Sequence, residues 1–191
     1  MATFRKIGKP SRAEYPEYSH VYMNLLKDDL LILDHLYENF FKVKEFIYSL
    51  PGEKLVYQYA ENKWTIKEIL VHLMDDERIF AYRALRYARN DSTALHGFEH
   101  DDYAKISNAG RRSLDRIFEE YWAVRYSTIL LFQNLPESSF MRSGGVLDDH
   151  GNIINIRTVR AVAYHIAGHE LRHMKIIKER YLDIKIDGEI I

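Results

Sequence analysis

The sequence predicts an all-α fold in which residues 1–191 form one domain, a four-helix bundle. Four stretches carry apolar residues at the period of an amphipathic helix, and one of them has a seven-residue repeat. Glycine and proline residues mark the ends of these stretches. A chain of 191 residues can bury one sizeable core, and 47% hydrophobic with 29% charged residues is typical of a soluble globular protein.

The chain begins with an arm and one helix. Residues 1–20 contain Pro10 and Pro16 and show no clear period, so we expect an N-terminal arm. From about Tyr22 to Leu50 the apolar residues follow one helical stripe, and Pro51 ends the pattern. The stripe consists of Ile32, Leu36, Phe40, Val43, Ile47 and Leu50. We therefore predict the first helix over residues 22–50.

The second and third helices have clear start or stop signals. Thr65 is suited to be the N-cap of the second helix, and Glu68 three residues later completes a capping box. This helix should run to about Asn90. The third helix is expected from about Ser113 to Asn134, and Pro136 follows its end. Its seven-residue seam is Leu114, Ile117, Tyr121, Val124, Thr128, Leu131 and Leu135.

The fourth helix should begin near Asn155 or Thr158 and continue to about Leu182. Roughly twenty residues separate the second helix from the third, and a similar stretch precedes the fourth, which is long for a compact domain. The first connection could cross the whole bundle and make helices two and three parallel. The second contains Gly144-Gly145 and His150-Gly151, with Val146-Leu147 and Ile153-Ile154 around the turn, which allows a small hairpin before the last helix.

Composition excludes several classes of function. The net charge is −1 without a long basic run, and the few basic residues near the start indicate a solvated tail, so nucleic acid is not an expected partner. The chain has no cysteine, which excludes disulfides, a thiol nucleophile and thiolate metal ligands. No stretch approaches the length of a membrane span, and the N-terminus lacks a signal-like apolar segment. We therefore expect a cytoplasmic protein without a membrane partner.

Two histidines in the fourth predicted helix suggest a metal site. His169 and His173 are four positions apart, so their imidazoles project from one face and can reach one ion. Both fall in the apolar seam of the helix, where a buried polar side chain needs a partner. Core carboxylates or carbonyls could satisfy them instead. With Glu170 between them, the stretch also matches the H-E-x-x-H pattern of zinc proteases.

Three metal arrangements match parts of this pattern. A zinc protease needs a further ligand beyond His173 and a sheet edge for its substrate, and the sequence predicts neither. A di-iron bundle needs two Glu-x-x-His pairs; Glu170 and His173 supply one, but Glu68 and His72 are one residue too far apart. His72 can instead be the third ligand, because it matches the depth of His173 if their helices are antiparallel. Three histidines with an open position form the catalytic pattern.

Two segments of the chain resemble the motifs of the DinB-like (DinB/YfiT-type) family of metalloenzymes. The first segment reads KWTIKEILVH from Lys63 to His72, followed by Asp76-Glu77-Arg78 and Tyr82-Arg83-Ala84-Leu85-Arg86. The second reads AGHELRHM from Ala167 to Met174. The resemblance covers about Tyr22 to Leu182, with the two motifs in the order, separation and helix placement of the family.

The resemblance implies a four-helix bundle of up-down-down-up topology, often dimeric, that holds zinc or nickel on three histidines. Matched motif by motif, these are His72, His169 and His173. It also implies an enzyme, either a thiol S-transferase that uses a low-molecular-weight thiol or a hydrolase or isomerase. Since the chain has no cysteine, such a thiol would come from a cofactor or substrate. We therefore expect a homodimer with a small-molecule substrate.

Further polar side chains near the predicted site have more than one interpretation. Glu77 and Glu170 could act as a general base or orient a ligand. They could instead form ion pairs with an arginine: Arg83, Arg125 or Arg172. His165, one turn before His169, could be a fourth ligand, but its place beside the seam favours a hydrogen-bonding role. The alternative function is a non-catalytic, stress-associated dimer whose metal is structural or lost.

Overall fold

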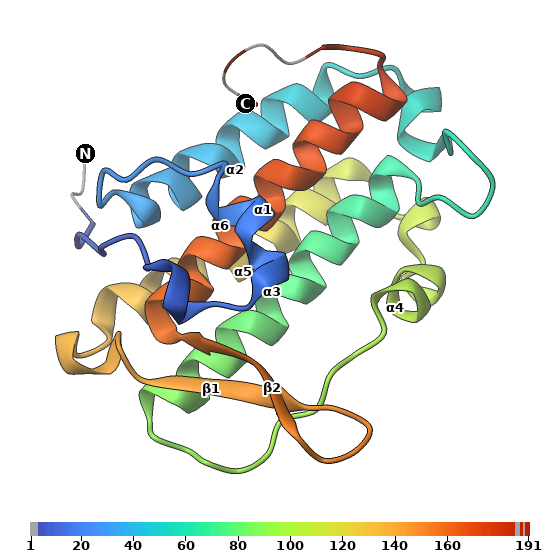
Figure 1. Ribbon diagram of the computed structural model, residues 1–191. Helices are drawn as coiled ribbons and strands as arrows, with labels where there is room; N and C mark the ends of the chain where they lie inside the picture. Colours follow the sequence, from blue (N-terminus) through green and yellow to red (C-terminus); the bar gives the residue numbers. More distant parts are fainter. Residues whose placement is uncertain (1–3, 186–187, 189) are drawn as a thin grey trace.

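Four long helices pack side by side in the computed structural model, which describes residues 4–185, 188 and 190–191 (Figure 1). They are α2 (Ile32–Tyr48), α3 (Ile66–Ala88), α5 (Leu114–Asn134) and α6 (Val159–Ile176). Helix α3 contacts both α5 and α6, and α2 contacts the same two helices. Each long helix therefore has two long neighbours, which is the arrangement of a bundle. The mainly helical fold predicted from the sequence is confirmed.

A small antiparallel hairpin lies beside the bundle, formed by β1 (Ser143–Leu147) and β2 (Ile153–Thr158). Val146 pairs with Ile154, and the register shifts between Gly144 and Val146. Gly145 permits this bulge, because a Cβ atom there would lie 2.4 Å from the carbonyl oxygen of Ile154. The small hairpin expected before the last helix is thus present, and the fold is not purely helical.

The first predicted helix is wrong in its N-terminal part. The structure has a short helix, α1 (His20–Met23), then an irregular segment, and α2 begins only at Ile32. Leu30 adopts a left-handed backbone conformation with φ of 68°, which a continuous helix does not tolerate. The Asp29 carboxylate accepts a hydrogen bond from the N–H of Leu31 at 3.0 Å and contacts the His35 ring at 2.8 Å. These contacts favour the start of a new helix at Ile32. This break lets α1 lie against α6 (Figure 1).

Helices α3, α5 and α6 each begin directly after an N-cap residue. Thr65 and Glu68 form the predicted capping box, with the Glu68 N–H donating to Thr65 Oγ1 at 3.2 Å and the Thr65 N–H donating back to Glu68 Oε2 at 2.7 Å. Ser113 caps α5. Thr158, not Asn155, caps α6, since its Oγ1 accepts the N–H of Ala161 at 3.2 Å. One π-helical turn, Ile177–Tyr181, extends α6 almost to the predicted end.

Between α3 and α5 the structure has an element that the sequence did not predict. The connection contains α4 (His100–Ile106), which contacts α3. Its seven residues are too few to produce a recognisable helical period in the sequence. Helix α4 and the segment before it cover one side of α3, and this places Phe98 and His100 at the edge of the candidate site.

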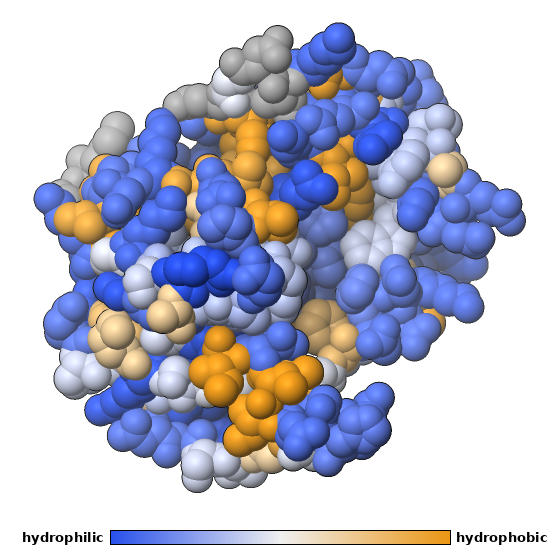
Figure 2. All heavy atoms as spheres, viewed as in Figure 1, coloured by the Kyte–Doolittle hydropathy of each residue, from blue (hydrophilic) through white to orange (hydrophobic). Residues whose placement is uncertain are grey.

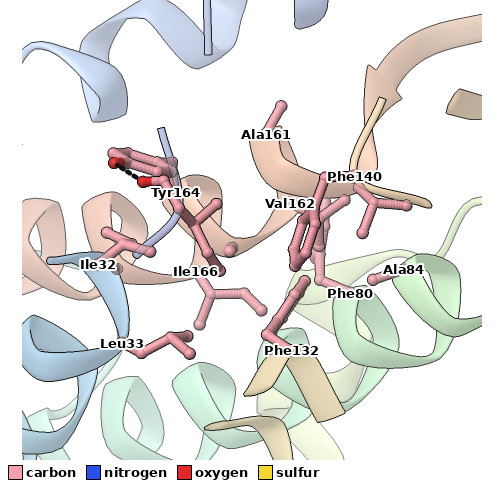
Figure 3. Close-up of a cluster of buried hydrophobic side chains, with 14 of the residues drawn as sticks. Ile32, Leu33, Phe80, Ala84, Phe132, Phe140, Ala161, Val162, Tyr164 and Ile166 are labelled. Carbon is pink, nitrogen blue, oxygen red and sulfur yellow. Dashed lines mark hydrogen bonds between the residues drawn. The ribbon is translucent and has the colours of Figure 1, made fainter. Parts of the chain in front are cut away.

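The core near the hairpin holds α3, α5 and α6 together. Phe80, Phe132, Val162 and Ile166 pack there (Figure 3), and each is at most 4% exposed. Burial of each such side chain contributes about 1.5–3 kcal/mol. A second cluster, around Phe40, Phe118, Met174 and Ile177, fills the other part of the bundle. The site described below lies on α3 and α6 between these two packed regions.

The described part of the N-terminal arm, residues 4–20, is anchored to the bundle and is not a solvated tail. Glu14 is buried and accepts hydrogen bonds from Arg160 Nε at 2.6 Å and Thr158 Oγ1 at 2.9 Å. The Tyr164 hydroxyl donates to the carbonyl oxygen of Ile7 at 2.8 Å, the contact drawn in Figure 3. These contacts carry the chain across α6 and bring Tyr18 and Tyr22 to the candidate site.

The outer surface is mostly hydrophilic, with an apolar patch over the hairpin (Figure 2). The patch contains Ile153, Ile154 and Ile156, which are all exposed. In the part of the chain that the structure describes, no helix combines the length and hydrophobicity that a bilayer crossing requires.

Candidate metal centre

The structure brings together the three histidines that the motifs singled out. His72 projects from α3, and His169 and His173 project from successive turns of α6. The Nε2 atom of His169 lies 3.2 Å from Nε2 of His72 and 3.0 Å from Nε2 of His173. All three ligand atoms lie within 4.8 Å of one another. His72 and His169 are buried, and His173 is partly buried.

The donor set fits a divalent metal ion. The two short Nε2–Nε2 separations, 3.0 and 3.2 Å, are close to the ~3.3 Å that follows from zinc–nitrogen distances of about 2.0–2.1 Å in a tetrahedral site. Burial lowers the pKa of His72 to about 3 and that of His173 well below its usual value, so these imidazoles stay neutral and can donate lone pairs. Nitrogen ligands suit zinc and nickel.

Asp76 stands behind the three histidines, one turn after His72 on α3. Its Oδ2 lies 3.2 Å from His169 Nδ1 and 3.8 Å from His165 Nε2. The His169 contact is within hydrogen-bond distance, but it does not have the full geometry of a hydrogen bond. Burial opposes ionisation, but the charge and contact of His169 outweigh it and lower the pKa of Asp76. The carboxylate therefore faces the far nitrogen of His169 as an anion, as is typical behind metal-binding histidines.

His165 lies outside the group of three. Its ring stacks on Phe80, with centroids 4.1 Å apart, and it stands edge-on to Tyr22. It is not among the ligand atoms that gather at the site, and within the described residues its Nδ1 has no hydrogen-bond partner. The structure thus places His165 beside Asp76, but at 3.8 Å the contact is too long for a hydrogen bond, and the hydrogen-bonding role of His165 stays a prediction.

A cavity of about 430 Å³ opens at the three histidines. Figure 2 shows the surface hollowed between the N-terminal segment and α4. Aromatic side chains make up much of the wall: Tyr18, Tyr22, Trp64, Phe80 and Phe98. The Trp64 ring is 4.6 Å from the His72 ring and stacks on that of His173. A cavity of this size with a few polar groups is typical of a small-molecule site.

Gly168, just before His169, permits the close approach that forms this wall. A Cβ atom at this position would lie 2.5 Å from the carbonyl oxygen of Tyr22. No side chain fits there without movement of the backbone, so glycine lets α1 pack directly on α6. Tyr22 can then place its ring 5.5 Å from the ring of His169. The residue before the second histidine therefore shapes the cavity.

Glu77 and Glu170 point away from the cavity and form a buried ion cluster. Arg125 Nε donates to Glu77 Oε1 at 3.0 Å, and Arg125 Nη2 donates to Glu170 Oε2 at 2.7 Å. The Tyr121 hydroxyl also donates to Glu170, and Arg125 Nη1 donates to the carbonyl oxygen of Leu36 at 2.7 Å. Neither glutamate lines the cavity. Of the two sequence interpretations, the ion pair with Arg125 describes this geometry, and a base facing the metal does not.

Sequence reasoning missed the positions of Asp76 and the aromatic wall. One signal was present, because Asp76 follows His72 by four residues and so shares its helix face. Tyr22 and Phe98 gave no such signal. They belong to separate segments that only the tertiary fold brings to α3 and α6.

Comparison with known proteins places this chain in a family. The family model described as the DinB superfamily matches residues 36–177, more than half of the chain, so the protein belongs to the DinB superfamily. Among solved structures it resembles YfiT from Bacillus subtilis, described as a probable metal-dependent hydrolase with an unusual four-helix bundle topology. The TM-score is 0.69 at 14% identity, over 96% of this chain and 98% of YfiT, which shows a shared fold. No curated protein sequence matches the chain significantly.

Proposed function

We propose that this protein is a metal-dependent enzyme that acts on small molecules. His72, His169 and His173 would hold one divalent ion, zinc or nickel, at the floor of the cavity. The observation that carries the proposal is the convergence of the three Nε2 atoms from two helices at this cavity, at 3.0 and 3.2 Å for two of the pairs. Three protein ligands leave a position open for a substrate, as in catalytic sites.

The metal, when bound, would lower the pKa of a water molecule or an external thiol and so supply a nucleophile near neutral pH. Asp76 would keep a proton on Nδ1 of His169 and leave Nε2 free as a ligand. Trp64 and Tyr22 cover the rings of the histidines and limit access of bulk water. The chain's own contribution is therefore to orient the ligands and to enclose the reacting group.

The geometry favours a small substrate over a peptide. A zinc protease needs the glutamate of its H-E-x-x-H motif beside the metal, but Glu170 is bound to Arg125 and Tyr121 in the core. The hairpin has two strands, and the cavity of about 430 Å³ is not an extended groove. Hydrolysis or thiol transfer on a small molecule is the reaction class that agrees with this site. If a thiol reacts, a low-molecular-weight cofactor would supply it.

The test compares metal-loaded with chelator-treated protein on small esters, on amides, and on an electrophile offered with a low-molecular-weight thiol. We expect turnover in the loaded protein, its loss on chelation, and its return when metal is added back. The His169→Ala variant should be inactive while its circular dichroism stays helical. Turnover that survives chelation, or casein cleavage that Glu170→Gln abolishes, would contradict the proposal. Tight metal binding without turnover would favour the non-catalytic alternative.

We also propose the remaining features that the resemblance implied. The course of the chain in Figure 1 supports an up-down-down-up order of α2, α3, α5 and α6. Aromatic side chains of α2 and α5, among them Phe41 and Tyr126, are exposed and would suit a homodimer contact. Light scattering on the purified protein tests the dimer, and a monomeric mass would exclude it. The cytoplasmic location and the absence of nucleic-acid and membrane partners stay predictions.

A further inference from the structure

Two buried arginines stack on Phe80, a residue of the cavity wall, and neither has a carboxylate partner among the described residues. Arg83 on α3 is 8% exposed, and Arg157 at the end of β2 is 3% exposed. Among the described residues, neither guanidinium has a carboxylate within ion-pair distance. Two nitrogens of Arg157, Nε and Nη1, have no hydrogen-bond partner there. Buried arginines are normally paired, so this pair of charges calls for an explanation.

Arg83 is the one of the two that lines the cavity. Its guanidinium lies over the ring of Phe80 at 4.9 Å and over that of Phe98 at 5.9 Å. One nitrogen, Nη2, donates to the carbonyl oxygen of His96 at 3.2 Å. Stacking on aromatic rings and this hydrogen bond fix the plane of the guanidinium. The N–H groups that are not used by His96 remain for a ligand.

Arg157 lies behind the aromatic wall of the cavity and adds to the positive charge near Arg83. It lies over the rings of Phe80 at 4.7 Å and Tyr18 at 5.5 Å, and it donates a short hydrogen bond to the Tyr18 hydroxyl. Burial lowers the pKa of Arg83, and the charge of Arg157 acts in the same direction. The two guanidinium groups therefore repel each other within a region shielded from water.

Among the described residues that line the cavity, only one carboxylate faces these charges. That carboxylate is Asp76, and its contacts are with His165 and His169. Two arginine charges against one aspartate charge leave the cavity positive, and a divalent ion on the histidines would add two more. A buried excess of this size favours a negatively charged ligand over a neutral one of the same shape.

From this arrangement we infer that the substrate carries a carboxylate group and that Arg83 binds it. The inference deepens the proposed function, because the reacting group of the same molecule would lie at the three histidines. The planar fork of a guanidinium matches the two oxygens of a carboxylate and can donate to both at once. Phe80 and Phe98 would keep the fork in place, while Arg157 strengthens the positive field. Arg83 is thus a binding residue that selects anionic substrates.

The test uses succinate as the anionic probe and succinamide as its neutral analogue. Binding of each is followed by NMR titration of the protein, once with metal bound and once after chelation. The variant is Arg83→Gln, and the matched control is Arg89→Gln, an exposed arginine at the end of the same helix. We expect Arg83→Gln to weaken succinate binding about tenfold or more in both states, since charged hydrogen bonds are lost. Succinamide binding and the Arg89→Gln variant should be unchanged.

Two results would overturn the inference. One is equal affinity for succinate and succinamide in the original protein, and the other is unchanged succinate affinity in Arg83→Gln. If that variant unfolds, Arg83→Lys retains the charge but not the fork, and it should weaken succinate binding by a smaller factor. Arg83-dependent succinate binding in a protein that takes up no metal would contradict the proposed function and leave this inference standing.

Discussion

His72 Nε2 on α3 lies 3.2 Å from His169 Nε2 on α6, although the two residues are 97 positions apart in the chain. Because Asp76 faces the other nitrogen of His169, the proton of that ring is best held there, and its Nε2 presents a lone pair. The same Nε2 also lies 3.0 Å from His173. A cation bound between the three rings would satisfy all of these lone pairs at once.

Asp76→Asn should weaken metal binding about 10–100-fold while the fold is retained, because outer partners of metal-binding histidines contribute on this scale. The amide carries no charge and cannot hold the His169 proton in the same way. The control is Asp75→Asn, whose carboxylate contacts Arg78 and not a histidine. Competition with a metal-binding dye measures both affinities. Equal affinities for the two variants would remove Asp76 from the site.

Arg125→Met should lower the free energy of unfolding by about 3–5 kcal/mol, since it leaves two buried carboxylates without their partner. Arg116→Met, on the same helix but exposed, should change it by less than about 1 kcal/mol. Urea denaturation measures both. If Arg125→Met does not fold, Tyr121→Phe removes one hydrogen bond to Glu170 and should cost about 1–3 kcal/mol. Little loss in either variant would show that the ion cluster is not structural.

The metal-free protein should lose stability as the pH falls from about 6.5 toward 4.5. Burial lowers the pKa of His72 to about 3 from 6.5, so in this window the unfolded chain binds a proton that the folded chain does not. One such histidine changes the free energy of unfolding by about 1.4 kcal/mol per pH unit. Burial shifts the pKa values of His165 and His173 in the same direction.

Urea denaturation at several pH values measures this slope, and His72→Ala should make it shallower. Stability that stays constant from pH 7 to 5 would mean that these imidazoles are not buried in their neutral form.

Most of the bundle could be predicted because its signals are local. The capping box at Thr65, the cap at Thr158 and the seam of the third helix depend on residues within a few positions of one another. The break at Leu30 could not be predicted in the same way. It depends on Asp29 bonding to Leu31 and on the packing of α1 against α6, which the apolar stripe does not record.

The candidate site likewise contains residues that local sequence signals identified and residues that only the tertiary packing identifies. His169 and His173 share a helix face, so their spacing alone predicted that they bind the same ion. His72 was predicted as the third ligand because it lies at a matching position along its helix and belongs to the first family motif. The partner of Glu170 stayed open among three arginines, and only the tertiary fold, which brings the Arg125 side chain of α5 to Glu170 of α6, selects Arg125. Arg83 gave no sign of its role in the sequence. Its position depends on Phe98, which lies in the segment before α4.

The metal content of the purified protein and of its histidine variants decides whether α3 and α6 share one metal site. Elemental analysis should find about one divalent ion per chain, as three ligands at one site require. His72→Ala, His169→Ala and His173→Ala should each lose most of it, and His165→Ala should lose less. His150→Ala, at an exposed turn, should retain the full content. Full occupancy in His72→Ala would contradict a site shared between α3 and α6.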